Sequence, residues 1–172
     1  MDTHVARLER AAPQQDNFTD SLLAGLAQAP KEIACKYFYD EAGSRLFDAI
    51  CALPEYYQTR TETMLLTRHA GEIAALMGEG VEIVEYGAGS LRKVRILLDA
   101  LPAARAYTPL DISGDYLASV VRNLAADYPA LTLRPMVGDF SISLDIPALP
   151  DSPRRARCWL PPSPVTGTGH PV

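Results

Sequence analysis

The sequence has few of the residues that build metal sites and disulfide frameworks. It contains three cysteines and three histidines, and neither set shows the spacing of a zinc-binding motif. An odd, sparse set of cysteines is typical of reduced thiols in the cytosol. We therefore expect no metal site and no disulfide framework.

Long apolar runs and an excess of positive charge are also missing. No apolar run approaches the ~20 residues that a membrane-spanning helix needs, and the polar amino terminus lacks the apolar core of a signal peptide. The 16 Lys and Arg are outnumbered by 21 Asp and Glu, which gives a net charge of −5. Because phosphate groups bind basic surfaces, this balance argues against a nucleic acid or an anionic membrane as partner. We expect a cytoplasmic protein, and the sequence leaves its oligomeric state open.

The first half of the chain reads as helical. Hydrophobic residues make up 48% of the 172 residues, which is enough for one domain with a core. Apolar residues at helical spacing predict helices over about 19–28 and 44–53 and a longer helix from Thr59. Thr59 and Glu62 have the spacing of a capping box, in which each side chain satisfies free amides at the helix start. Residues 1–80 are thus predicted to form an N-terminal helical segment.

The second half alternates strands with helices. Strands are predicted over 81–86, 106–112 and 131–140, with a helix in each gap. This alternation implies parallel strands joined by right-handed crossovers, so we predict an α/β fold with half of a doubly wound sheet over residues 81–150. Pro109 lies inside the second strand and is better suited to an edge or a bulge.

Three short motifs fall where those strands end, which is where ligands bind in doubly wound sheets. The stretch "VEIVEYGAGSLRKV" places Gly87 and Gly89 between a strand and a helix that Ser90 can cap. Glycine leaves room for a ligand against the main chain, and the helix start can direct free amides at an anionic group. Asp111 follows Gly87 by 24 residues, which is close to the ~20 expected for an acid that accepts hydrogen bonds from ribose hydroxyls.

The third strand ends in Gly-Asp-Phe, and these residues suit a nucleoside. Asp139 can accept a hydrogen bond from the adenine amine, and Phe140 can lie against the adenine ring. The dinucleotide fingerprint G-x-G-x-x-G is not met because its last position is Arg92. The missing fingerprint argues against NAD or FAD as the cofactor and favours S-adenosylmethionine. A plain turn at the two glycines and a nucleotide-binding oxidoreductase remain alternatives.

An aromatic loop upstream offers groups for a substrate. Tyr39 and Tyr56 lie in two segments without helical or strand periodicity. Phenol hydroxyls can orient an amine or an imidazole, and aromatic faces suit a sulfonium or a methylated ammonium.

Four segments together carry a specific resemblance. "KYFYDEAGSRLFDAICALPEYYQTRTE", "VEYGAGSLRKVRILLDAL", "PLDIS" and "GDF" resemble the histidine-specific N-alpha-methyltransferase family over roughly residues 29–150. The resemblance implies a class I methyltransferase with a Rossmann-like sheet that uses S-adenosylmethionine. Members trimethylate the α-amine of histidine to give hercynine in ergothioneine biosynthesis.

The resemblance also implies a role for individual residues. Residues 1–80 would provide the substrate-binding cap, where Tyr39 touches the histidine amine as the catalytic residue and Tyr56 touches the imidazole. Cofactor contacts are implied for Gly87 and Gly89 with the amino-acid part, Lys93 with the carboxylate, Asp111 with the ribose, and Asp139 and Phe140 with the adenine. Leu91 departs from the family pattern because it removes a hydroxyl, which would weaken cofactor contacts modestly.

The last residues depart from that family. The stretch 151–172 holds five of the chain's 14 prolines and shows no periodicity, so we expect a disordered tail. "CWLPP" within it is compatible with a frameshifted family sequence. Members are about twice as long, so we expect a sheet truncated after its third strand, with an unpaired edge on the first strand and weak or absent catalysis. A non-catalytic remnant or binding fragment is the alternative.

Overall fold

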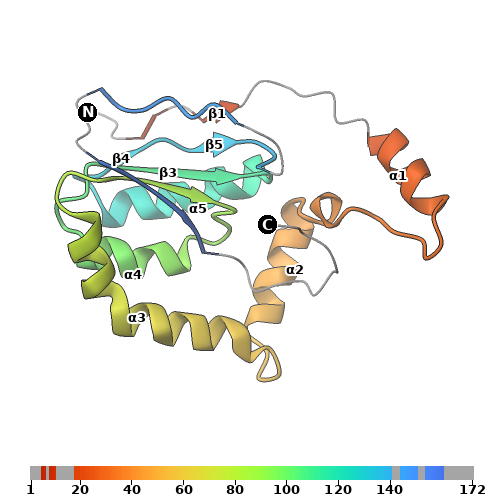
Figure 1. Ribbon diagram of the computed structural model, residues 1–172, viewed down its shortest axis with the longest axis horizontal. Helices are drawn as coiled ribbons and strands as arrows, with labels where there is room; N and C mark the ends of the chain where they lie inside the picture. Colours follow the sequence, from red (N-terminus) through yellow and green to blue (C-terminus); the bar gives the residue numbers. More distant parts are fainter. Residues whose placement is uncertain (1–4, 7, 11–17, 141–143, 151–153, 161–172) are drawn as a thin grey trace.

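A parallel sheet lies at the centre of the molecule, as the computed structural model shows (Figure 1). The structure describes residues 5–6, 8–10, 18–140, 144–150 and 154–160. The strands are β1 (Glu9–Arg10), β2 (Glu82–Tyr86), β3 (Ala106–Asp111), β4 (Thr132–Leu133), β5 (Met136–Val137) and β6 (Arg155–Trp159). They are arranged in the order β1-β5-β3-β2-β6, with β4 also beside β3, and every pair is parallel. The predicted α/β fold class is confirmed.

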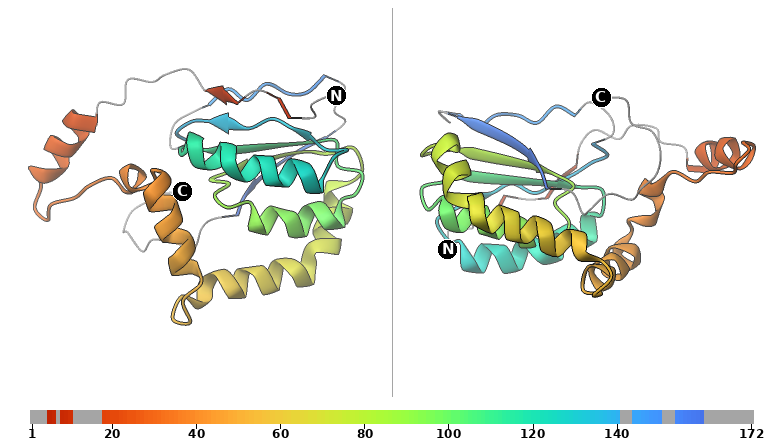
Figure 2. Two further views of the ribbon diagram at one scale, coloured as in Figure 1. Left: turned by 180° about the vertical axis from the view of Figure 1, so that it is seen from behind. Right: turned by 60° about the horizontal axis from the view of Figure 1, so that its bottom comes forward.

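Helices cover one face of this sheet (Figure 2). They are α3 (Tyr57–Met77), α4 (Arg92–Ala100) and α5 (Gly114–Asp127). Their apolar residues pack on Ile83 of β2 and Tyr107 of β3, both fully buried. The opposite face is covered by residues 144–150, whose Ile146 packs on Val84 and Leu110. The two faces of the sheet are therefore packed against two separate cores.

The N-terminal segment contains three short helices before α3. They are α1 (Phe18–Leu26), the 3-10 helix η1 (Cys35–Phe38) and α2 (Glu41–Cys51). Asp40 caps α2, since its side chain accepts a 2.7 Å hydrogen bond from the Gly43 amide. Helix α1 extends away from the sheet, whereas α2 lies near the carboxyl ends of the strands (Figure 1).

The start of α3 differs from the sequence expectation. The helix begins at Tyr57, and its N-cap Tyr56 makes no side-chain capping bond. The Thr59 hydroxyl instead lies 3.5 Å from the Cys51 sulfur, and Glu62 pairs with Lys93 of α4. The predicted capping box is therefore wrong, because both of its side chains have partners on other elements.

The third predicted strand is divided into β4 and β5, and Pro109 explains the division. The Tyr107 carbonyl accepts from the Arg134 amide, and the Asp111 carbonyl accepts from the Gly138 amide. Backbone groups alternate along a strand, so residue 109 faces β4 and β5 as residues 107 and 111 do. Residue 109 is a proline and has no N–H to donate to that side. Pro109 thus lies in a central strand, contrary to expectation, at the point where its neighbour is interrupted.

The tail contains a strand, which corrects two expectations. Residues 155–159 form β6, which pairs with the whole of β2, from Glu82 with Arg155 to Tyr86 with Trp159. Disorder was therefore the wrong prediction for 155–159, and β2 has no unpaired edge there. Residues 151–153 and 161–172 of the predicted tail lie outside the described residues.

A buried carboxylate fastens β6 to the rest of the sheet. Glu82 is fully buried, and Arg155 meets it with two parallel bonds of 2.9 and 3.1 Å. Arg134 adds a bond of 3.2 Å to the same carboxylate. Meanwhile Ala156 and Cys158 face the helix-covered core. The many prolines around residues 155–159 led to a prediction of disorder, although charged and small side chains alternate along this strand.

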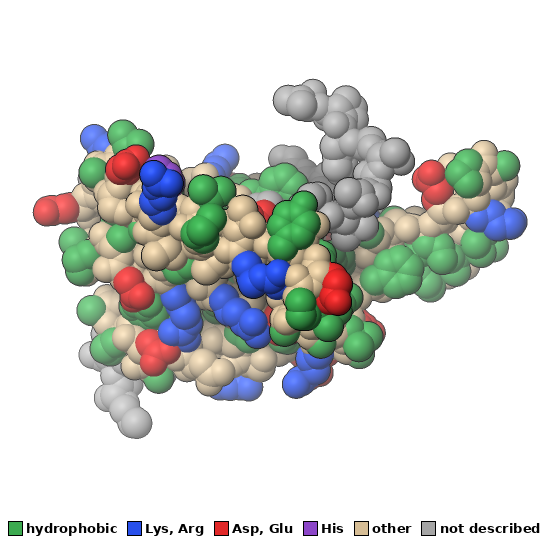
Figure 3. Space-filling view, turned by 90° about the horizontal axis from the view of Figure 1, so that it is seen from below, with side chains coloured by type: hydrophobic (Ala, Val, Ile, Leu, Met, Phe, Trp, Pro, Cys, Tyr) green, Lys and Arg blue, Asp and Glu red, His purple; other side chains and the backbone are tan. Residues whose placement is uncertain are grey.

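The face of the molecule seen from below shows no single dominant charge (Figure 3). Seen from below, Lys and Arg side chains lie among Asp, Glu and apolar side chains (Figure 3). Among the helices of the described residues, none combines the length and apolar character needed to cross a membrane.

Candidate functional site

The turn after β2 brings two of the predicted glycines together with Asp111. Gly87 and Gly89 have φ of 67° and 54°, values that side-chain-bearing residues rarely adopt. The Gly87 amide donates to the Leu110 carbonyl at 2.9 Å, which fixes the turn against the end of β3. Apart from the Gly87 carbonyl at 3.9 Å, a β-carbon on Gly89 would meet nothing. The space beside Gly89 is therefore open to a ligand.

Asp111 is the polar centre of this turn. One carboxylate oxygen accepts from the Gly89 amide and the other from the Ser113 amide, each at 2.9 Å. Burial raises the pKa of Asp111, and these backbone hydrogen bonds hold the rise back. The Ile112 amide also bonds to this carboxylate. A carboxylate has about four acceptor positions, so one remains for a ligand hydroxyl.

The helix after the turn starts differently from the prediction. Leu91, rather than Ser90, is the N-cap of α4, and it has a left-handed φ of 58° with no side-chain capping bond. Leu91 is also buried in the helix-covered core. The residue that departs from the family pattern therefore contributes packing at the base of the turn.

Two predicted cofactor residues have protein partners in this structure. Lys93 forms an ion pair with Glu62 of α3, and Asp139 forms one of 2.9 Å with Lys36 of η1. A ligand carboxylate or adenine amine would have to share these groups. Phe140 lies closer to the turn, since its ring would approach a β-carbon on Gly87 to 3.2 Å. The roles of these residues remain predictions.

Tyr39 and Tyr56 are brought together by α2. Both rings meet Phe47 edge-on, with centroid distances of 6.3 and 6.0 Å. Burial raises the pKa of Tyr39, and the nearby Cys35, Tyr56 and Asp111 raise it further. The Tyr39 phenol is therefore a neutral hydroxyl at physiological pH, and it lies close enough to Asp111 for that charge to raise its pKa.

Side chains of α2 connect this tyrosine pair to the sheet. The Tyr116 hydroxyl of α5 donates a hydrogen bond to Asp48, and Arg92 of α4 lies 4.0 Å from the same carboxylate. With the Lys36–Asp139 pair, these contacts hold the N-terminal segment over the ends of β3 and β5. Sequence patterns contain no signal for Asp48 or Lys36, because their partners are distant in the chain.

Glu85 is a buried acid to which the sequence assigned no role. It is 1% exposed, accepts a hydrogen bond from the Tyr107 hydroxyl, and has its pKa raised to about 8 by burial. Cys158 of β6 lies close by, and burial, with the charge of Glu85, raises its pKa to about 12. The Cys158 thiol is therefore protonated and unreactive. The only sequence signal for Glu85 was an acid within a predicted strand, which Glu82 shares.

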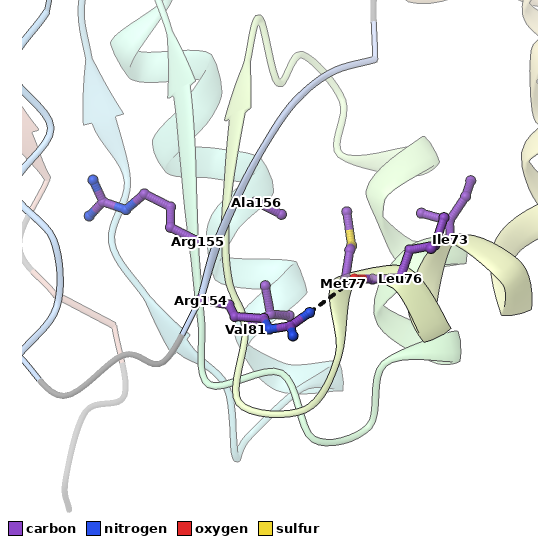
Figure 4. A pocket seen from close by; sticks show the side chains of 7 residues that line it. All are labelled: Ile73, Leu76, Met77, Val81, Arg154, Arg155 and Ala156. Atoms are coloured by element: carbon purple, nitrogen blue, oxygen red, sulfur yellow. Dashed lines mark hydrogen bonds between the residues drawn. The ribbon is translucent and has the colours of Figure 1, made fainter.

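A hollow at the opposite end of the sheet is separate from these residues (Figure 4). It has a volume of about 420 Å³ and lies between the end of α3 and β6, lined by residues such as Leu76, Met77 and Ala156. Arg154 crosses it to reach the Leu76 carbonyl at 3.4 Å. The hollow has few polar groups, and the candidate site is therefore assigned to the carboxyl end, where the acids and glycines meet.

The chain also matches a known protein family. A family model described as "Histidine-specific methyltransferase, SAM-dependent" matches residues 18–163. The chain belongs to this methyltransferase family. The match includes β6, so the resemblance extends further than the expected end near residue 150.

Several relatives share this family. Histidine N-alpha-methyltransferase of Mycolicibacterium smegmatis is 43% identical over 120 residues, 68% of this chain and 37% of that protein. Ergothioneine biosynthesis protein 1 of Neurospora crassa is 34% identical over 134 residues, 76% of this chain and 15% of that protein. N-methyltransferase fsqC of Aspergillus fumigatus is 30% identical over 164 residues, 94% of this chain and 42% of that protein. The chain spans less than half the length of these relatives.

The family's cofactor is S-adenosylmethionine, and the residues at the turn fit it. The open space beside Gly89 admits a ligand against the backbone, and Asp111 presents a buried acceptor next to it. Membership of a methyltransferase family favours this cofactor over the nicotinamide of an oxidoreductase.

Proposed function

We propose that the chain binds S-adenosylmethionine at the carboxyl end of β2 and β3 and methylates the α-amine of L-histidine. The observation that carries the proposal is the contact between the Asp111 carboxylate and the Gly89 amide, beside open space. This contact joins an acceptor for ribose hydroxyls to a turn that admits the cofactor's amino-acid part. The name of the Mycolicibacterium smegmatis relative, histidine N-alpha-methyltransferase, supports histidine as the substrate.

The bound cofactor would supply an electrophilic methyl group on its sulfonium. The histidine amine must reach this carbon without a proton, because an ammonium has no lone pair, and a free α-amine titrates near pH ~8. The raised pKa of Tyr39 keeps its hydroxyl protonated, so Tyr39 orients the amine and does not remove its proton. Most of the acceleration would then come from proximity and alignment.

Lys93 and Asp139 are proposed to take part as exchangeable partners. Lys93 would share its charge between Glu62 and the cofactor carboxylate, and Asp139 would share its oxygens between Lys36 and the adenine amine. Phe140 would contribute its exposed ring to the adenine, since 41% of it is accessible. Tyr56 would face the imidazole from the other side of Phe47.

Binding of S-adenosylhomocysteine, followed by calorimetry, tests the cofactor half of the proposal. Asp111→Asn removes the charge but keeps the shape, and we expect it to weaken binding about tenfold to a hundredfold because charged acceptors are lost. Asp115→Asn, an exposed acid in the first turn of α5, is the matched control and should bind as the wild type does. Equal affinities of the two variants would contradict the role of Asp111.

A methyl-transfer assay with labelled cofactor and histidine tests the substrate half. Label should appear on the α-amine of histidine and be lost when histidine is replaced by its N-acetyl derivative. Binding of S-adenosylhomocysteine without any methyl transfer would leave the chain as a cofactor-binding fragment.

A further inference from the structure

Trp159 lies beside the candidate cofactor site, on a strand that was expected to be disordered. It ends β6 and pairs in register with Tyr86, the residue before the glycine turn. Its indole nitrogen would be 3.7 Å from a β-carbon placed on Gly87. Even so, 63% of the side chain is exposed. A large aromatic ring therefore faces solvent directly next to the turn.

The sheet topology places this ring at the point where chain direction across the sheet reverses. From β2 the chain proceeds outward through β3 and β5, and then returns to place β6 on the other side of β2. Ligands of open α/β sheets bind outside the carboxyl ends at such a switch point. Asp111 stands on one side of the turn and Trp159 on the other, so a ligand lying across the turn meets both.

The two sides of the turn suit different parts of the ligand. Asp111, Asp139 and Phe140 belong to the β3 and β5 side, where a nucleoside finds its acceptors. Strand β6, Arg155–Trp159, contains no acid among its described residues and ends in an exposed indole. Aromatic faces, and tryptophan above all, attract cations within ~6 Å. The β6 side is therefore chemically matched to a positively charged, poorly hydrated centre.

We propose that the indole of Trp159 forms the wall of the site on the sulfonium side and stabilises the charged cofactor by a cation–π contact. This inference rests on the proposed cofactor binding. It gives the tail strand a role in recognition in addition to its role in completing the sheet. It also predicts that the cationic cofactor is held better than its neutral product, which would favour product release.

The experiment uses the fact that Trp159 is the chain's only tryptophan. Calorimetric titrations of the full chain with S-adenosylmethionine and S-adenosylhomocysteine give the two affinities, and tryptophan fluorescence is recorded in parallel. We expect the fluorescence change to follow the calorimetric binding curve for both ligands. Heat of binding without a fluorescence change would overturn the role of Trp159 while leaving the proposed function intact.

Substitutions separate a charge contact from simple packing. Trp159→Leu should weaken S-adenosylmethionine binding about threefold to tenfold and leave S-adenosylhomocysteine binding within a factor of about two, whereas Trp159→Phe should retain much of the preference for the cation. Arg157→Met, an exposed position two residues earlier on β6, is the control and should change neither affinity.

Each remaining result has a defined meaning. Equal losses for the two ligands in Trp159→Leu would overturn the cation–π contact and indicate stacking or packing. Absence of binding of either ligand to the wild-type chain would overturn the proposed function and this inference together. If Trp159→Leu does not fold, the wild-type fluorescence titration still decides whether the indole contacts the ligand.

Discussion

At the scale of single residues, Glu85 is an acid that lies buried and keeps its proton at neutral pH. Its carboxyl group is buried beneath the glycine turn, and the Tyr107 hydroxyl donates to it. Burial raises its pKa from 4.5 to about 8, so the folded protein holds a proton that the unfolded chain releases. The stability of the fold therefore depends on pH through this residue.

The sign of that dependence gives a prediction for Glu85→Gln. Between about pH 5 and 8 the folded state binds more protons at Glu85 than the unfolded state, so wild-type stability falls as pH rises and levels off above the folded pKa. Glutamine does not titrate, so the wild type should lose up to about 1.4 kcal/mol per pH unit relative to the variant. Urea denaturation across this pH range measures the difference, with exposed Glu79→Gln as control. A constant difference would show that Glu85 is ionised in the folded state.

At the scale of elements, β6 depends on the ion pair between Arg155 and Glu82. Arg155→Met removes a two-bond contact to a fully buried carboxylate, leaving Arg134 as its cationic partner. We expect a loss of about 2–4 kcal/mol in the free energy of unfolding, less than the cost of a wholly unpaired buried charge. Arg157→Met on the same strand should cost less than about 0.5 kcal/mol because its side chain is exposed. Similar unfolding curves for the two variants would mean that β6 does not pair with β2 in solution.

The elements also show how far the sequence alone leads. Strands β2 and β3 were predictable because each is a short stretch rich in β-branched and aromatic residues that ends at a glycine or an acid, with a helical pattern between them. The glycine turn and Asp111 were predictable from the same order of strands. In contrast, β6 was missed because its pattern is only five residues long and its burial depends on Glu82, 73 positions away. Lys36 and Asp48 were missed for the same reason, since local patterns do not record contacts between distant segments.

At the scale of the whole molecule, the well-packed sheet contrasts with helix α1, which has few buried contacts. Helix α1 buries only Gly25, exposes Phe18, Leu23 and Leu26, and extends away from the sheet (Figure 1). Segments with few buried apolar contacts open with little free energy. We expect amide hydrogens of α1 to exchange first in native-state hydrogen exchange measured by mass spectrometry, and those of β2 and β3 last. Equal protection of α1 and β3 from hydrogen exchange would require a further surface that covers α1.

The parallel pairing of β6 with β2 has a consequence for biosynthesis. A ribosome releases β2 long before it releases β6, so the middle of the sheet keeps one bare side until nearly the whole described chain has emerged. Contacts between such distant segments form late, because the intervening loop must close first. In newly made molecules, β2 would therefore have an unpaired edge for an interval. Chaperones that bind extended segments would be needed most during that interval.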